Sequence, residues 1–327
     1  MLRSMYSGVS GMKGNQTKLD VIANNIANVS TTAFKSSKVN FSDTLYQSSA
    51  TATAPTTSIG GTNSKSVGLG TKVSSINKLM SKGNLLTTGR ALDVAIDGDG
   101  YMIVTKGTVD GKIAVGSNAI TGTTAITDKI YTRDGNLSLD KDGNLLTSNG
   151  YRVMGYRCSN AQYDTTGGVI AVKKGIYQDG TPAPTYDDTA LEALAIPDKV
   201  EGNAVQSFAI GADGVITATT SAGKCVLGQI AMASFKNPEG LQDLGGNFQQ
   251  ESGNSGGALV RDIATKAAAS SNSGAFGAVS QGYLEASNVD LTEQFTDMIS
   301  ATRAFQASSK MISNGDEILQ TITGLIR

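Results

Sequence analysis

Histidine and tryptophan are absent from the 327 residues of this sequence, and cysteine occurs only twice. Histidine is the usual general base near neutral pH and a common metal ligand. Its absence excludes histidine metal sites and the Ser–His and Cys–His nucleophile pairs. An enzyme of this composition would have to use carboxylates or lysine. Cys158 and Cys225 form no CxxC pair and no zinc spacing, so we expect two small buried thiols, with a disulfide as the alternative.

Long hydrophobic runs are also missing. No run of about 18 apolar residues occurs, so we expect no membrane-spanning helix. The N-terminal stretch MLRSMYSGVSGMKGNQ lacks the continuous apolar core of a Sec signal peptide, and a role outside the cytoplasm would require another export route. The net charge of −1 gives no reason to expect nucleic acid or an anionic membrane as a partner. The length indicates one to three domains.

The N-terminal segment carries an apolar repeat that alternates steps of three and four residues. This spacing predicts a helix with a seam for a partner helix. Glycines in its first half weaken the helix and allow a neighbour to approach closely. The end of the helix carries three asparagines, at 24, 25 and 28, and the following Val-Ser-Thr-Thr run favours extended backbone, so we expect the helix to stop after Asn28. The residues expected to pack are Leu2, Met5, Val9, Met12, Leu19, Ile22 and Ile26.

The C-terminal segment mirrors this pattern. Asp290 and Glu293 form a capping-box-like start, and the helix after them is expected to run about 36 residues, or some 54 Å. Residues 1–35 carry four basic side chains against one acid, and residues 285–327 carry three against six, so the net charges of +3 and −3 favour pairing of the two helices. Two ordinary amphipathic helices on a globular core are the alternative. The residues expected to pack are Leu291, Phe295, Met298, Phe305, Ile312, Ile318, Ile322 and Leu325.

The sequence between these helices has a pattern typical of β-structure. Short apolar stretches separated by Asp-Gly and Asn-Gly pairs predict consecutive hairpins. The expected fold class is α+β: paired terminal α-helices forming a coiled coil, mainly antiparallel β domains, and a small inserted β domain. The expected domains are a helical domain (1–35 and 283–327), an extended linker (36–90), a β-rich core (91–156 and 200–282) and a small inserted outer domain (157–199).

Motifs that would carry chemistry fail on inspection. GNSGG at 253–257 has the letters of a nucleophile elbow around Ser255, but there is no histidine to take the proton. DKDGNL at 140–145 misses the spacing of an EF-hand, and no phosphate loop or dinucleotide fingerprint occurs. We therefore expect no catalytic, cofactor-binding or metal-binding residues. A hydrolase based on carboxylates stays as an alternative, with Glu239, Glu251 and Glu285 as its candidates.

Both ends and several internal segments resemble bacterial flagellar axial proteins of the rod and hook. The resemblance covers about 200 residues in the same order. Within that family, the nearness of SVGLGTKV to FSDTLYQ, the pair LGQIAMASF and LEASNVDL, and the insertion resemble hook subunits more than distal rod subunits, which stay the alternative. The segments that carry the resemblance are SGMKGNQTKLDVIANNIANVSTTAFK, TGRALDVAIDGDGYMIV, YTRDGNLSLDKDGNLLTSNGYRVMGY and GYLEASNVDLTEQFTDMISATRAFQASSKMISNGDEILQTI.

The resemblance implies a structural role without catalysis. Hook subunits polymerise into a flexible helical tube that passes motor torque to the filament, and their terminal helices resemble a coiled-coil pair. The implied partners are further copies, rod, hook-cap and hook–filament junction proteins, and the flagellar export apparatus, with no nucleic acid and no membrane. The implied location is the extracellular flagellum, reached without a Sec signal. Some spirochaete hooks carry covalent links between subunits, which makes Cys158 and Cys225 crosslink candidates. A β-rich surface adhesin is the third alternative.

Overall fold

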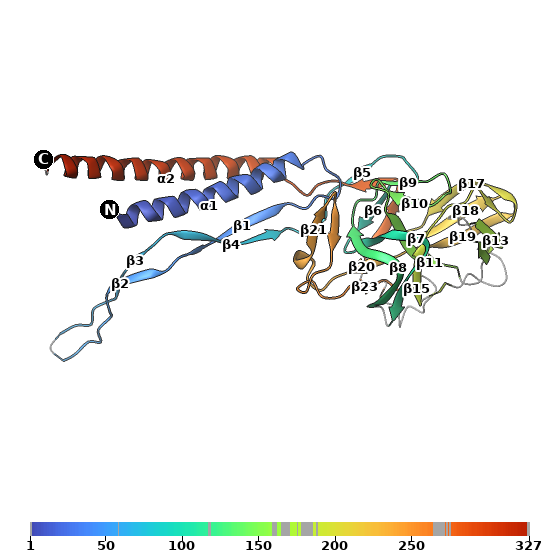
Figure 1. Ribbon diagram of the computed structural model, residues 1–327, viewed down its shortest axis with the longest axis horizontal. Helices are drawn as coiled ribbons and strands as arrows, with labels where there is room; N and C mark the ends of the chain where they lie inside the picture. Colours follow the sequence, from blue (N-terminus) through green and yellow to red (C-terminus); the bar gives the residue numbers. More distant parts are fainter. Residues whose placement is uncertain are drawn as a thin grey trace. The chain divides into compact units, whose positions relative to one another are not determined.

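The computed structural model divides the chain into two compact units (Figure 1). Unit 1 comprises Met1–Ser30, Lys35–Leu79 and Asn288–Arg327, and unit 2 comprises Thr31–Phe34 and Met80–Ser287. No helix in the described ranges is long and apolar enough to cross a membrane. Much of the predicted inserted domain, 157–199, lies outside those ranges. The structure describes residues 2–57, 59–116, 119–158, 162–164, 171–174, 176–177, 186–187, 189–263, 272, 274 and 276–325.

Unit 1 is built on two helices, α1 (Leu2–Ala27) and α2 (Leu291–Leu325), which lie side by side. Asp290 caps α2, since its Oδ1 atom accepts hydrogen bonds from the backbone amides of Thr292 (2.8 Å) and Glu293 (3.3 Å). The predicted start of this helix is therefore confirmed. At the end of α1, the Asn28 side chain donates to the backbone oxygen of Asn24 at 2.9 Å. Both helices begin and end close to where the sequence places them.

Two antiparallel strand pairs complete unit 1. Strand β1 (Ser37–Asp43) pairs with β4 (Thr71–Lys78), and β2 (Tyr46–Ala50) pairs with β3 (Lys65–Gly68). The sequence predicts an extended link in this region, and the structure shows that its extended segments pair with one another. A two-stranded ribbon is marginally stable on its own, and β1 and β4 also contact α1.

Unit 2 consists of short strands in mainly antiparallel order, and β13–β16 is a parallel pair. A long hairpin of β7 and β8 organises the main sheet, which runs from β7 to β23. The strands are β5 (Leu85–Thr87), β6 (Val94–Asp97), β7 (Tyr101–Gly116), β8 (Ala119–Thr132), β9 (Leu137–Leu139), β10 (Leu145–Thr147), β11 (Arg152–Arg157), β12 (Gln162–Asp164), β13 (Ala171–Lys174), β14 (Ile176–Tyr177), β15 (Ala190–Ala193), β16 (Lys199–Val200), β17 (Asn203–Ile210), β18 (Val215–Thr220), β19 (Gly223–Ile230), β20 (Met232–Ser234), β21 (Gln242–Gly245), β22 (Phe248–Gln250), β23 (Leu259–Val260), β24 (Ala278–Gln281) and β25 (Tyr283–Glu285).

The core of unit 2 lies between the faces of these strands, where two clusters of apolar side chains are buried. Alternation along β18 buries every second residue, as a half-buried strand requires. Cys158 and Cys225 are both buried, and neither forms a disulfide in the described part of the chain. The coarse fold class is confirmed, because helices stand at the two ends of the chain and mainly antiparallel strands lie between them. The domain boundaries stay a prediction.

A buried ion pair joins distant parts of unit 2. The Nε atom of Arg133 donates to Oε2 of Glu285 at 2.9 Å, and the Gly83 amide donates to Oε1 at 3.1 Å. The guanidinium also donates to the backbone oxygens of Gly98 (2.8 Å) and Gly100 (2.9 Å). Both side chains are buried, so removing their charges from water costs free energy. The hydrogen bonds to the two groups help to offset that cost, together with the attraction between the charges. Glu285, a hydrolase candidate from the sequence, therefore has a structural position.

Removing this carboxylate should destabilise unit 2. Glu285→Ala leaves the Arg133 guanidinium buried without its anionic partner, and we expect the free energy of unfolding to fall by about 3–5 kcal/mol. The measurement is urea unfolding followed by the near-ultraviolet circular dichroism of the buried tyrosines. Lys82→Ala, which removes an exposed ion pair with Asp97, is the control and should cost less than about 1 kcal/mol. Equal effects of the two substitutions would contradict this account.

Candidate assembly interface

The two helices of unit 1 run antiparallel and approach closely at glycines. A Cβ atom at Gly8 would lie 3.3 Å from Ile312, one at Gly11 would lie 3.2 Å from the Ser308 hydroxyl, and one at Gly315 would lie 3.1 Å from Met5. A Cβ atom at any of these positions would make a tight contact, so the facing side chain would have to shift by a few tenths of an ångström. The glycines that weaken α1 as an isolated helix therefore permit its contact with α2.

An ion pair links the helices further along. The Nζ atom of Lys18 lies 3.1 Å from Oδ1 of Asp297, and both side chains are partly exposed. Such a pair contributes at most about 1 kcal/mol. It nevertheless agrees with the opposite net charges of the two terminal segments.

Asn25 fastens α1 to the first strand. Its side chain is buried, and its Oδ1 atom accepts a hydrogen bond from the Ser37 amide at 3.0 Å. Its Nδ2 atom donates to the Ser37 backbone oxygen and to Oε1 of Gln294, both at 2.9 Å. The side chain of Asn25, on α1, thus joins this helix to both β1 and α2. This role explains why a mediocre helix former occupies a buried position near the end of α1.

Asn288 makes a second link of the same kind. Its Oδ1 atom accepts from the Ser36 amide at 2.7 Å, and its Nδ2 atom donates to the Leu79 backbone oxygen at 2.7 Å. The Leu79 amide in turn donates to the Ser36 oxygen at 2.8 Å. The residues just before β1, just after β4 and just before α2 are therefore tied together in unit 1. The segment LEASNVDL supplies this link and the cap of α2.

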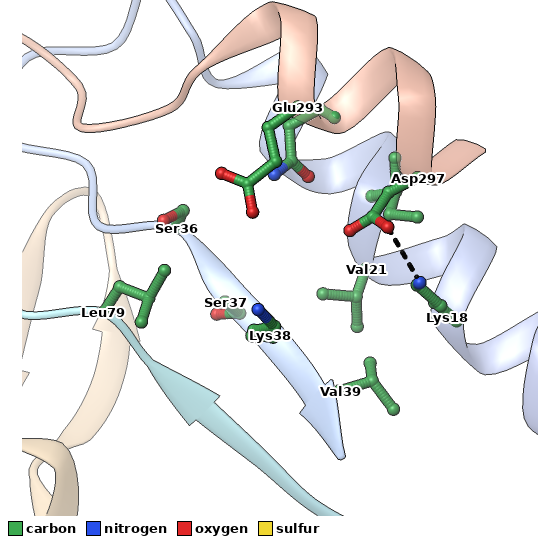
Figure 2. Close-up of a pocket in the computed structure, with 11 residues that line it drawn as sticks. Lys18, Val21, Ser36, Ser37, Lys38, Val39, Leu79, Glu293 and Asp297 are labelled. Atoms are coloured by element: carbon green, nitrogen blue, oxygen red, sulfur yellow. Dashed lines mark hydrogen bonds and ion pairs between the residues drawn. The ribbon is translucent and has the colours of Figure 1, made fainter. Parts of the chain in front are cut away.

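A small pocket lies among α1, α2, β1 and the end of β4 (Figure 2). Its volume is about 140 Å³, and Val21, Val39 and Leu79 give it an apolar side. Glu293 and the Lys18–Asp297 pair line the opposite side, with carboxylates directed toward the space. In the described part of the chain, no cluster of acidic or cysteine side chains has the arrangement of a metal site. The pocket thus offers packing space and no catalytic constellation.

The predicted packing residues divide by exposure. Ile22 is buried, and Leu2 belongs to α1 with its side chain outside the described part of the structure. The partly buried set is Met5, Met12, Leu19, Ile26, Met298, Phe305 and Ile312. The exposed set is Val9, Leu291, Phe295, Ile318, Ile322 and Leu325. The helix pair by itself therefore covers part of this set, and the role of the seam in packing stays a prediction.

Sequence reasoning missed Asn25, Asn288 and Gln294 as structural residues. Three asparagines within five positions of a helix were a signal, since they are costly unless their side chains have partners. The pattern did not say which of the three is buried. Asn24 is exposed and Asn25 is buried, a difference that only the position of β1 determines.

The Asn25 link gives a direct prediction. Asn25→Ala removes three hydrogen bonds and leaves the Ser37 amide without its partner, so the free energy of unfolding of unit 1 should fall by about 3 kcal/mol. The measurement is urea unfolding followed by the far-ultraviolet helix signal, because both helices lie in unit 1. Asn24→Ala is the matched control on the exposed side and should change stability by less than about 1 kcal/mol. A larger loss from the control would refute the assignment.

Comparisons with known proteins agree on one family. Family models match at residues 5–35 (flagella basal body rod protein), 120–218 (flagellar hook protein FlgE/F/G D1 domain) and 280–325 (flagellar basal body rod FlgEFG protein C-terminal). The flagellar basal-body rod protein FlgG of Bacillus subtilis is 42% identical over 328 residues, covering 100% of both chains. The flagellar hook protein FlgE of Borreliella burgdorferi is 27% identical over 450 residues, covering 99% of this chain and 100% of that one.

A solved structure, that of the Helicobacter pylori flagellar hook protein FlgE2, covers 61% of this chain at a TM-score of 0.40 and 11% identity, too low to carry an argument. The full-length match to the Bacillus protein and the family models at both ends are sufficient. The chain belongs to the bacterial flagellar rod and hook axial protein family.

Proposed function

We propose that the chain is a structural subunit of the flagellar hook, which polymerises into a flexible helical tube and transmits torque from the rod to the filament. It acts without catalysis. Its partners are further copies of itself, rod, hook-cap and hook–filament junction proteins, and the flagellar export apparatus. Its location is the extracellular part of the flagellum. Family membership supports the axial role, and the finer assignments rest on the resemblance of its segments.

The observation that carries polymerisation is apolar surface on α2. Phe295 is 50% exposed and Leu325 is 81% exposed in the single chain. Met311, Ile318 and Leu325 follow one another at steps of seven residues, which places them on one face of the helix, and all three are exposed. Burying a side chain of this size stabilises by about 1.5–3 kcal/mol. Neighbouring copies in a tube would cover this face, with the terminal helices forming a coiled-coil layer.

The distal rod is the second candidate. The relative that is 42% identical is named a rod protein and has nearly the length of this chain, whereas the hook-named relative aligns over 450 residues. The hook reading rests on the motif segments and on the insertion at 157–199. The two readings differ in the mechanics of the polymer, because a hook tube bends and a rod tube is straight.

The proposal extends to crosslinking at the cysteines. Cys158 and Cys225 are buried thiols, so a covalent link between subunits would require local opening of unit 2. Denaturing gels of the polymer address this point, because a polymer that runs entirely as monomer removes the crosslink from the proposal. The axial role does not depend on that result.

Apolar surface on α2 should control assembly. The double variant Met311→Ser, Ile318→Ser removes two exposed apolar side chains, so the fold should persist while the critical concentration for tubes rises more than about tenfold. Negative-stain microscopy and sedimentation of the concentrated protein measure this. The matched control is Ser309→Ala on the same helix, an exposed position that should leave the critical concentration unchanged.

Removal of residues 1–28 tests the helix pair as a whole. The intact chain should form tubes, and the chain without these residues should form none. Curved tubes would support the hook and straight tubes the rod. Absence of tubes from the intact chain, even on addition of hook-cap protein, would contradict the axial role and favour a monomeric surface protein.

A further inference from the structure

Residues 31–34, here called the strap, belong to unit 2, although α1 before them and β1 after them belong to unit 1. The peptide unit between Thr32 and Ala33 is held at both of its edges. Its carbonyl oxygen accepts a hydrogen bond from Nδ2 of Asn247 at 3.0 Å, and its amide donates to the backbone oxygen of Glu285 at 2.8 Å. These two bonds fix the orientation of the peptide plane.

The strap lies on a seat formed by Thr132, Asp134 and Asn247, whose members are bonded to one another. The Thr32 hydroxyl donates to Oδ1 of Asp134 at 3.0 Å, just after β8. The Asp134 amide donates to the Thr132 hydroxyl oxygen at 3.0 Å, and that hydroxyl donates to the backbone oxygen of Asn247 at 2.9 Å. Thr132 is buried. The seat therefore has hydrogen bonds of its own that do not involve the strap.

The backbone of the strap is strained at Ala33. Its φ angle is 55°, in the left-handed region, where the Cβ atom of an L-residue comes too close to the following carbonyl oxygen. Asn247, at 64°, is another of the three described residues besides glycine with a positive φ angle. Since φ is the rotation about the bond from the amide nitrogen to Cα, the peptide plane clamped by Asn247 and Glu285 sets the φ angle of Ala33. Backbone strain of this kind is found at switch regions.

We propose that the peptide unit between Thr32 and Ala33 is a two-state switch. In the seated state, which the structure shows, its two hydrogen bonds hold Ala33 at positive φ. In the released state Ala33 relaxes to negative φ, which turns the peptide plane away from both partners, so the two bonds break together. Unit 2 stays folded during this step, because the residues of the seat remain bonded to one another.

The switch gives the backbone between α1 and β1 a conformational freedom of its own. Rotation about a single bond redirects the chain just after α1, so neither unit has to unfold. Such a step supplies a local joint within one subunit. The inference goes beyond the proposed function and does not depend on it, because the switch belongs to the single chain before any assembly.

Two amides that are bonded to the same residue provide the first test. The amide of residue 33 donates to the backbone oxygen of Glu285, and the Gly83 amide donates to its Oε1 atom at 3.1 Å. Hydrogen exchange of single amides is measured by nuclear magnetic resonance on the full, unassembled chain, at rising urea concentrations below the unfolding transition. We expect exchange at residue 33 to be independent of urea, because release exposes little surface, and exchange at Gly83 to accelerate with urea. Equal acceleration at both amides would overturn the proposal.

Substitutions at the clamp should change the population of the released state. Asn247→Gly removes the side-chain donor and keeps a residue that adopts positive φ, so exchange at residue 33 should accelerate about fivefold. Thr32→Val removes the bond to Asp134 and should act in the same direction. Ala33→Gly relieves the strain, so exchange at residue 33, corrected for its intrinsic rate, should slow about threefold. Unchanged exchange in all three variants, or acceleration by Ala33→Gly, would contradict the switch.

The control destabilises unit 2 as a whole. Ile230 is buried in its core, and Ile230→Val should lower global stability while the fold persists, which circular dichroism checks. Exchange at Gly83 should then accelerate about fivefold, whereas exchange at residue 33 should stay unchanged, because release does not pass through global unfolding. The same acceleration at residue 33 as at Gly83 would show that the strap opens only together with unit 2, and the proposal would be wrong.

Discussion

The structure depends on one constraint, which is that the last fifty residues of the chain pair and pack with its first hundred. In unit 2, β24 pairs with β6, β25 pairs with β5, and Glu285 accepts from Gly83 and Arg133. In unit 1, Asn288 links the backbone at Ser36 and Leu79, and α2 then packs along α1. These contacts close long loops of chain, so they form only where several bonds offset the entropy of closure.

This constraint explains the polar residues at the two ends. A helix such as α1, with glycines at 8, 11 and 14, is weak on its own and gains order from its partners. Gly8 and Gly11 also let α2 approach, Gly14 faces Phe41 of β1, and Asn25 fixes the end of α1 to β1 and α2. The helix is therefore stabilised mainly by its contacts with α2 and β1 and less by its own helix propensity. A subunit of this kind suits a polymer, in which further copies supply the contacts that the single chain lacks.

Much of the architecture could be predicted from the sequence, because it depends on local pattern. The heptad steps and Asp290 locate both helices, and the Asp-Gly and Asn-Gly pairs indicate antiparallel hairpins. The rest depends on contacts distant in sequence. The pairing of β1 with β4, the burial of Asn25 beside exposed Asn24, and the Arg133–Glu285 pair join residues that no local pattern connects. The packing residues were the hardest part, because burial in one chain does not determine burial in a tube.

The central claim is that apolar surface on the helices of one chain is covered by further copies. The most direct measurement is amide hydrogen exchange of residues 1–28 and 291–325 in the free chain and in the assembled tube, read by mass spectrometry. The account predicts weaker protection in the free chain and strong protection in the tube, since further copies cover the helix surface that the single chain exposes. Equal, strong protection of these residues in both states would contradict it.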